Sequence, residues 1–175
     1  DECGNTTAQT ITVEVKDAIA PAFNYPKCGE HVVLPNTSGA CSNLYSWIRP
    51  WSSVPNVSDC NSFSVTETIS NPTVQQAVNL SNPFNYNGFF FQVFVTAQFP
   101  VGVTTVSYTA TDASNNVSVC SFTVEIKDTQ KPQLTCPGNQ VLTATCPTAQ
   151  VPDYRNLVLV SDNCPGNVVL TQKFA

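Results

Sequence analysis

The chain has 175 residues and a formal net charge of −5, and only 11% of its residues are charged, against roughly 25% in an average soluble domain. The acidic balance argues against a nucleic-acid partner, which calls for a basic patch. No apolar run approaches the roughly 18 residues that a membrane span needs, so we expect no span in this segment.

The first predicted element is a β-strand over residues 9–16, in which Ile11, Val13 and Val15 alternate with polar residues. A period of two with one apolar face marks a half-buried antiparallel strand. The next distinctive feature is segment 70–96, which holds six aromatic residues between positions 84 and 94. Asn87-Gly88 lies among them and is a strong type I′ turn signal, so we predict an aromatic hairpin insertion that turns there.

This aromatic hairpin supplies the candidate binding residues, because consecutive side chains on a strand point to opposite faces. One face can join the core, whereas the other needs a cover or a partner, since large exposed apolar patches mark interaction sites. We favour packing against Trp47, Trp51 or a neighbouring unit, and the alternative is stacking on a glycan or protein ligand. The possible binding residues are Tyr86, Phe89, Phe90, Phe91 and Phe94.

Two further strands are predicted over residues 106–111 and 119–127, where apolar and polar residues again alternate. The polar cluster at 112–116 separates them and predicts a hairpin turn. Tyr108 is either a tyrosine corner, whose hydroxyl bonds the backbone upstream, or an ordinary core residue. No segment shows a convincing helical period, and short strands broken by Pro and Asn turns predict an all-β sandwich.

The sequence also contains an internal repeat. Residues 1–17 align without a gap with residues 112–128, so that Asp1 matches Asp112, and seven positions are identical. A second match relates VSDC at 57–60 to VSDNC at 160–164. We therefore predict the last strand of a preceding repeat at 1–17, a complete unit at 18–128 with its insertion at 70–96, and the first part of a following repeat at 129–175. The chain is expected to be a slice of a longer array, and the alternative is a short two-domain protein with unrelated ends.

Several stretches resemble the hyalin repeat (HYR) module. Residues 99–116, the CSFTV sequence at 120–124 and Asp128 look like its signature. With LTCP at 134–137, VPDY at 151–154, SDNC at 161–164 and VLTQ at 169–172, the chain resembles HYR-like repeats of very large bacterial surface adhesins, including gliding-motility adhesins of Bacteroidetes. The resemblance implies tandem immunoglobulin-like antiparallel β-sandwiches in an extracellular adhesive protein. Segment 70–96 departs from the pattern, and Tyr25 stands where Cys136 predicts a cysteine.

The eight cysteines are expected to form disulfides in an oxidising, extracytoplasmic compartment. The four cysteines of the complete unit allow three pairings, among which spacing alone does not choose. In a sandwich of this kind the last strand lies beside the first, which favours Cys28–Cys120. The pairs that follow are Cys41–Cys60 and, by analogy, Cys146–Cys164, with partners outside the chain for Cys3 and Cys136.

A catalytic, metal or cofactor site finds little support. A Ser–His–Asp set would need His31, the only histidine, which lies in an early segment without a nucleophile elbow. The cysteine spacings do not resemble paired zinc knuckles. Carboxylates at turns and unit junctions are expected to cap those turns, with calcium binding as the alternative. They are Asp17, Asp59, Asp112, Asp128 and Asp162.

We therefore expect a non-enzymatic structural module of a secreted, multi-repeat cell-surface adhesin that serves surface attachment or gliding motility. Its expected partners are neighbouring repeats of the same polypeptide, and further candidates are surface glycans or other cell-surface proteins. Linkers at 16–21 and 127–132 would join the units, and their prolines would stiffen them because proline fixes φ. The alternatives are a recognition module acting through the 70–96 hairpin and a subunit of a self-assembling extracellular fibre.

Overall fold

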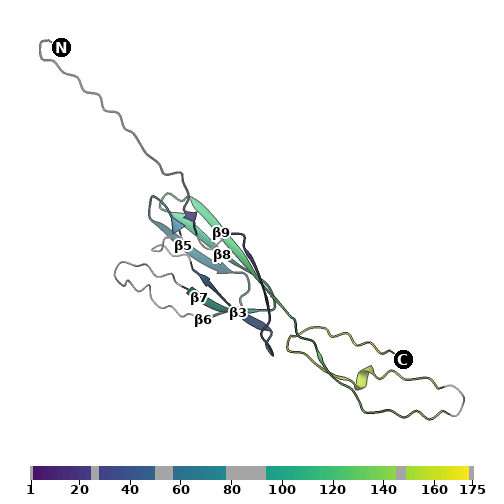
Figure 1. Cartoon of the computed structure of the whole chain (residues 1–175). Coiled ribbons are helices and arrows are strands. Elements are labelled where there is room, and N and C mark those ends of the chain that lie inside the picture. Colours follow the sequence, from purple (N-terminus) through teal and green to yellow (C-terminus); the bar gives the residue numbers. More distant parts are fainter. Residues whose placement is uncertain (1, 25–27, 50–56, 78–93, 145–148, 174–175) are drawn as a thin grey trace, which may run out of the picture.

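The computed structural model describes residues 2–24, 28–49, 57–77, 94–144 and 149–173, which form an all-β protein (Figure 1). A short 3₁₀ helix, Arg155–Leu157, precedes the last described strand. The strands are β1 (Ala22–Phe23), β2 (His31–Pro35), β3 (Ser42–Ile48), β4 (Val57–Ser58), β5 (Phe63–Ile69), β6 (Gln75–Ala77), β7 (Phe94–Pro100), β8 (Gly102–Asp112), β9 (Val117–Lys127), β10 (Gln133–Thr135) and β11 (Leu159–Ser161).

Two sheets make up a β-sandwich. The larger has the strand order β2-β9-β8-β5, and the smaller has the order β3-β7-β6. All pairs in these sheets are antiparallel except β2–β9, which is parallel, so the predicted antiparallel sandwich is present with one parallel pair. The last strand of the sandwich does lie beside β2, as predicted from the sequence.

The core lies between the two sheets and follows the predicted alternation. On β8, the inward residues Val106, Tyr108 and Ala110 are buried, and their neighbours on the strand are more exposed. The inward positions of β9, from Cys120 to Ile126, are buried in the same way. Aromatic rings from the second sheet fill the space opposite, where Trp47 packs edge-on against Phe99. The predicted strands at 106–111 and 119–127 are therefore confirmed.

The predicted hairpin turn at 112–116 is also present. β8 and β9 pair antiparallel up to Thr111 and Val117. Asp112 organises the turn, because its Oδ1 accepts hydrogen bonds from the backbone N–H groups of Ser114 and Asn116, both at 2.8 Å. Asn115 takes a left-handed conformation with φ of 66°, which asparagine tolerates better than most residues.

The strand predicted over residues 9–16 does not form. The segment has no regular secondary structure, and Ile11, Val13 and Val15 are 79%, 76% and 91% exposed. An alternating sequence becomes a strand only when a neighbouring strand accepts and donates its backbone hydrogen bonds. No strand in the described part of the chain pairs with it, and Figure 1 shows the segment leading away from the sandwich.

Segment 70–96 contributes strands to the sandwich at both of its ends. β6 and β7 pair antiparallel, with Ala77 opposite Thr96, and β7 also pairs with β3 over seven residue pairs. These ends are thus part of the second sheet and not an addition to it. The predicted turn at Asn87-Gly88 lies outside the described residues.

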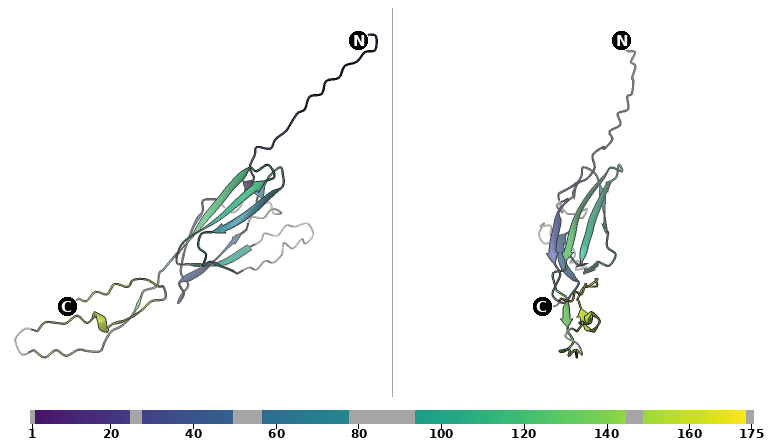
Figure 2. Two further views of the ribbon diagram at one scale, coloured as in Figure 1. Left: turned by 180° about the vertical axis from the view of Figure 1, so that it is seen from behind. Right: turned by 90° about the vertical axis from the view of Figure 1, so that its right-hand side faces the viewer.

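The two short ribbons at the ends of the sandwich share one register. In the first, Ala22 lies opposite Ser58, and in the second, Gln133 lies opposite Ser161. Ala22 and Gln133 have the same offset in sequence as Asp1 and Asp112, so β1 and β10 begin at equivalent positions of the repeat. Figure 2 shows that the segment carrying β10 and β11 extends from the end of the sandwich opposite the N-terminal segment. Among the described residues, no helix has the length and apolarity to cross a bilayer.

Candidate functional site: the junction after the sandwich

Asn36 is the centre of a set of hydrogen bonds that attaches residues 128–130 to the sandwich. It directly follows β2, and its backbone N–H donates to the carbonyl of Lys127 at 2.9 Å, which extends the β2–β9 ladder. Its buried side chain donates from Nδ2 to Asp128 Oδ1 at 3.0 Å, and its Oδ1 accepts the backbone N–H of Thr129 at 3.1 Å. The linker is therefore held by specific polar contacts as it leaves the sandwich.

Gln130 adds a second pair of contacts to the same loop. Its Oε1 accepts the backbone N–H of Gly39 at 2.8 Å, and its Nε2 donates to the carbonyl of Thr37 at 2.9 Å. We call loop 36–41, linker 128–132 and residues 162–164 the junction clamp. In this clamp the Gln130 side-chain amide takes the place of water as the partner of two exposed backbone groups.

A disulfide between Cys41 and Cys164 closes the junction clamp covalently. The neighbouring Asn163 donates from Nδ2 to the carbonyl of Ala40 at 3.0 Å. The predicted pairs Cys41–Cys60 and Cys146–Cys164 are therefore wrong, and Cys146 itself lies outside the described residues. Sequence reasoning kept each pair inside one unit, whereas folding brings the loop after β2 against the loop after β11.

The second disulfide joins Cys28 to Cys120, the pairing that the sandwich topology favoured. Cys28 precedes β2, and Cys120 lies on β9 with its side chain buried. Gly29 continues the contact, because its N–H donates to the carbonyl of Ser121 at 2.7 Å. This bond therefore ties the start of the first sheet to its last strand.

A groove of about 770 Å³ lies beside the Cys41–Cys164 bond. Its walls come from the end of β7, from the linker and from residues 165–169. Asp128 and Asp162 line it, but both carboxylates already accept backbone hydrogen bonds. The groove therefore forms where the segment after the sandwich packs against the sandwich, and its two carboxylates already serve as turn caps.

The N-terminal side of the sandwich has a related arrangement around Asp17. Its Oδ2 accepts hydrogen bonds from Asn61 Nδ2 at 2.6 Å and from the Cys60 thiol at 3.2 Å. Asn116 donates from Nδ2 to the Asp17 carbonyl at 3.2 Å, and Ser118 donates to the carbonyl of Pro21 at 2.5 Å. The linker before β1 is therefore fixed to the β8–β9 turn and to the loop after β4.

The junction carboxylates act as turn caps, as predicted. Each accepts the backbone N–H of the residue two positions later, at 2.8 to 3.1 Å. This is the geometry of an Asx turn. The five are Asp17, Asp59, Asp112, Asp128 and Asp162.

The carboxylates also affect the nearby cysteine. The hydrogen bond from the Cys60 thiol to Asp17, with a smaller contribution from Asp59, raises the pKa of that thiol to about 11. The backbone N–H of Ile19, and then the side chains of Cys60 and Asn61, lower the pKa of Asp17. Cys60 therefore remains a protonated thiol at neutral pH.

A buried polar network connects the two sheets of the sandwich. Trp47 Nε1 donates to the Tyr108 hydroxyl at 2.6 Å, and that hydroxyl donates to Glu67 Oε2. Arg49 binds both oxygens of Glu67, at 3.0 and 2.6 Å. Burial and the Glu67 carboxylate raise the pKa of Tyr108. Tyr108 is thus not a tyrosine corner, because its single hydroxyl proton goes to a carboxylate.

Sequence reasoning missed Glu67, although the signal was present. Phe63, Val65 and Ile69 alternate with polar residues on β5, and Glu67 occupies the same inward-facing set. A charged residue at an inward position predicts a buried partner. Its partners come from β8 and from the end of β3, so only the fold identifies them.

Replacing Tyr108 with phenylalanine is expected to lower the free energy of unfolding by about 1–3 kcal/mol, because it leaves the buried Trp47 indole N–H without its hydrogen-bond partner and removes one hydrogen bond from Glu67, which Arg49 still binds. Urea unfolding followed by tryptophan fluorescence measures the change. Ser107→Ala, on the outer face of the same strand, is the matched control and should stay within about 0.5 kcal/mol of the wild type. Equal effects of the two substitutions would contradict this role of the network.

His31 lies on the outer face of the larger sheet. Its Nδ1 is 2.6 Å from Thr123 Oγ1, and its Nε2 is 3.0 Å from Glu125 Oε2. Thr123 is its partner in the β2–β9 register. These contacts are cross-strand pairs of a sheet surface, which stabilise a sheet modestly.

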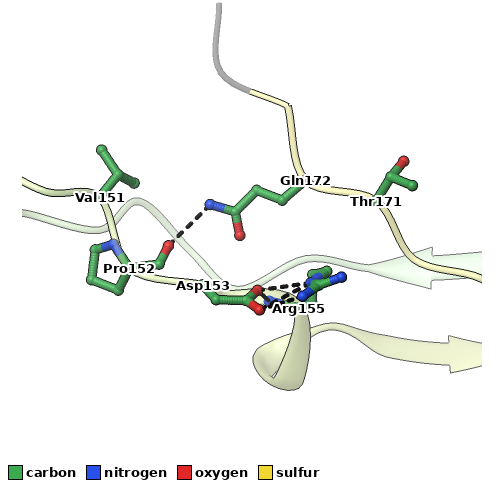
Figure 3. A pocket seen from close by; sticks show the side chains of 6 residues that line it. All are labelled: Val151, Pro152, Asp153, Arg155, Thr171 and Gln172. Carbon is green, nitrogen blue, oxygen red and sulfur yellow. Dashed lines mark hydrogen bonds and ion pairs between the residues drawn. The ribbon is translucent and has the colours of Figure 1, made fainter.

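A shallow pocket of about 400 Å³ lies on the segment after the sandwich, and Figure 3 shows the six side chains that line it. Asp153 and Arg155 form a bidentate ion pair there, with contacts of 2.7 to 3.0 Å, which lowers the pKa of Asp153 to about 2. Gln172 donates to the carbonyl of Pro152 at 3.0 Å and accepts the N–H of Tyr154 at 2.8 Å. The charged groups of the pocket thus satisfy one another.

Of the predicted aromatic binding residues, the described part of the chain includes Phe94. This residue begins β7 and lies opposite Ile48 in the register with β3. Tyr86, Phe89, Phe90 and Phe91 lie outside the described residues, as does Trp51. The binding prediction for this segment therefore stays a prediction.

A family model of the HYR domain matches residues 55–126 of the chain. No curated protein and no solved structure gives a significant match. The matched segment includes β4 to β8 and all of β9 but its last residue, and thus contains most of the sandwich, including Cys120. HYR domains are extracellular-type modules, and the two disulfides agree with such a location. The chain therefore contains a HYR domain, an immunoglobulin-like module of the cell-surface and adhesion type.

Proposed function

We propose that the chain is a structural repeat module of a secreted cell-surface adhesin, in which sandwiches stand in series as a stalk and the junction clamp carries tension between them. The observation that carries the proposal is the Cys41–Cys164 disulfide, which connects the complete sandwich to the segment that follows it. Surface attachment or gliding motility would be the process that such a stalk serves. No enzymatic activity is part of this proposal.

The disulfide determines which residues experience a stretching force. Cys41 and Cys164 are 123 residues apart in sequence but directly bonded. Force applied at residues 1 and 175 therefore passes from Cys41 to Cys164 and bypasses everything from β3 to β11. A covalent bond between the two points cannot extend as an unfolding chain does, so β3 to β11 are shielded and the force acts on β1 and β2.

Single-molecule force spectroscopy on the chain, held at its two ends, tests this shielding. At about 3.6 Å per extended residue, the oxidised wild type should extend to about 190 Å, because only residues 1–41 and 164–175 can straighten. The variant Cys41→Ser/Cys164→Ser should extend further, to about 300 Å, because the Cys28–Cys120 disulfide then limits the extension to residues 1–28 and 120–175.

Cys136→Ser is the matched control, because Cys136 is exposed and outside both disulfides. Its extension should equal that of the wild type. If the wild type and the double variant reach the same length, the junction clamp does not carry tension, and the proposed stalk function loses its structural basis.

A further inference from the structure

We propose that Cys60 forms a second inter-unit disulfide, whose other sulfur belongs to a cysteine at the Cys41 position of a preceding unit of the same kind. The proposal rests on the proposed function, since it requires units in series. It concerns a bond that sequence reasoning had placed inside the unit and that the described structure does not contain.

The first argument is the likeness of the two junctions. Cys60 lies beside Asp17 and Asp59, and Cys164 lies beside Asp128 and Asp162. In each group the sulfur and the carboxylate oxygens are within 4.8 Å of one another. The N-terminal junction thus presents a cysteine in the surroundings that hold the bonded Cys164 at the other end.

The second argument is the local backbone. Asp17 caps Ile19 at 3.0 Å and Asp128 caps Gln130 at 3.1 Å, and the two aspartates match each other in the sequence repeat. The ribbons β1–β4 and β10–β11, which lead into the cysteine loops, also share their register. Cys60 directly follows Asp59, whereas Asn163 stands between Asp162 and Cys164. The two cysteines therefore differ by one position within equivalent loops.

The third argument is access. Cys60 is exposed, and its sulfur is outside both disulfides. Its thiol donates to Asp17 Oδ2 at 3.2 Å in an exposed hydrogen bond. Cys41, the partner of Cys164 at the other junction, lies in the loop between β2 and β3, which contacts the segment after the sandwich. The same loop of a preceding unit would reach Cys60.

Bond formation is a thiol–disulfide exchange with an organic disulfide such as oxidised glutathione. The two cysteine thiols lose two protons and two electrons and form one S–S bond. Oxidised glutathione accepts the two protons and the two electrons and yields two glutathione thiols, so the reaction is balanced.

The consequence is a short covalent path through the whole array. Force would enter a unit at Cys60, pass along the short segment that connects it to Cys41 and leave for the next unit, without running through the rest of the repeat. The extensible chain per unit would thus be about sixfold shorter, about 70 Å in place of about 400 Å at about 3.6 Å per residue. Such a stalk would confine its extension to the segment from Cys41 to Cys60, which includes β3 and β4.

The test duplicates the unit by joining residues 1–132 to residues 22–175, which keeps Pro132 at the position of Pro21. The new junction retains loop 36–41 and linker 128–132, and Asp59 and Cys60 of the second copy stand in place of residues 162–164. In the inter-unit design, Cys60→Ser in the first copy and Cys41→Ser in the second leave a Cys41–Cys60 bond possible only between copies. The matched intra-unit design places Cys60→Ser and Cys41→Ser both in the second copy, so that only the first copy can bond within itself.

Both proteins are refolded with oxidised and reduced glutathione and mapped by mass spectrometry of non-reduced peptides. The Cys28–Cys120 peptide reports that each copy has folded. We expect the Cys41–Cys60 peptide in the inter-unit design and its absence in the intra-unit design. The reverse result, two alkylated thiols, or Cys41 of the first copy bonded to Cys164 would each overturn the proposal. The stretching experiment on the original chain does not involve Cys60, so either proposal can fail without the other.

Discussion

Replacing Phe99 with alanine is expected to lower the free energy of unfolding of the sandwich by about 3–5 kcal/mol. Phe99 is fully buried on β7, where its ring packs edge-on against Trp47 at 5.8 Å and Tyr45 at 6.3 Å between centroids. Alanine would remove these contacts and leave a cavity between the two sheets. Urea unfolding followed by circular dichroism, under non-reducing conditions, measures the loss.

Leu44→Ala is the matched control for this prediction. Leu44 lies on β3, which pairs with β7, but its side chain is 58% exposed. Its loss should change the free energy of unfolding by less than about 0.5 kcal/mol. If the two variants unfold at the same urea concentration, the core is not centred between β3, β7 and the larger sheet.

Removing the Cys28–Cys120 disulfide is expected to cost about 2–4 kcal/mol, mainly because the unfolded chain gains freedom in a loop of 92 residues. The double variant Cys28→Ala/Cys120→Ala is preferable to a single substitution, because it leaves no buried thiol that could mispair. Chemical unfolding without reductant should show a lower midpoint than the wild type.

Cys136→Ser again serves as the comparison, since it removes a thiol outside both disulfides. Its unfolding midpoint should match that of the wild type. A double variant with an unchanged midpoint would show that the pairing of β2 with β9 holds the first sheet together without the covalent bond.

Some parts of the fold were predictable because local chemistry decides them. Val106, Tyr108 and Ala110 alternate with polar residues, and a period of two admits only one face to the core. Asp112 forms its turn with atoms from the next four residues. The Cys28–Cys120 pair followed from the rule that the last strand of such a sandwich lies beside the first.

Other parts depended on contacts that lie far apart in sequence. Residues 9–16 have the same alternation as the strands of the core, yet they remain extended without a partner strand. Glu67 is tolerated at an inward position because Tyr108 from β8 and Arg49, the residue after β3, contact it there. The residues that flank segment 9–16 and Glu67 in the sequence determine neither the missing strand nor the buried carboxylate.

The cysteines show the division most clearly. The sequence by itself determined that the chain is an all-β protein with disulfides, because strand periodicity, turn capping and cysteine content are local properties. Only the tertiary structure decided that Cys41 bonds Cys164 across the junction instead of Cys60 within the unit. A disulfide forms where two loops meet, with Cα atoms here 4.8 Å apart. That meeting depends on how the segment after β9 packs against the end of the sandwich.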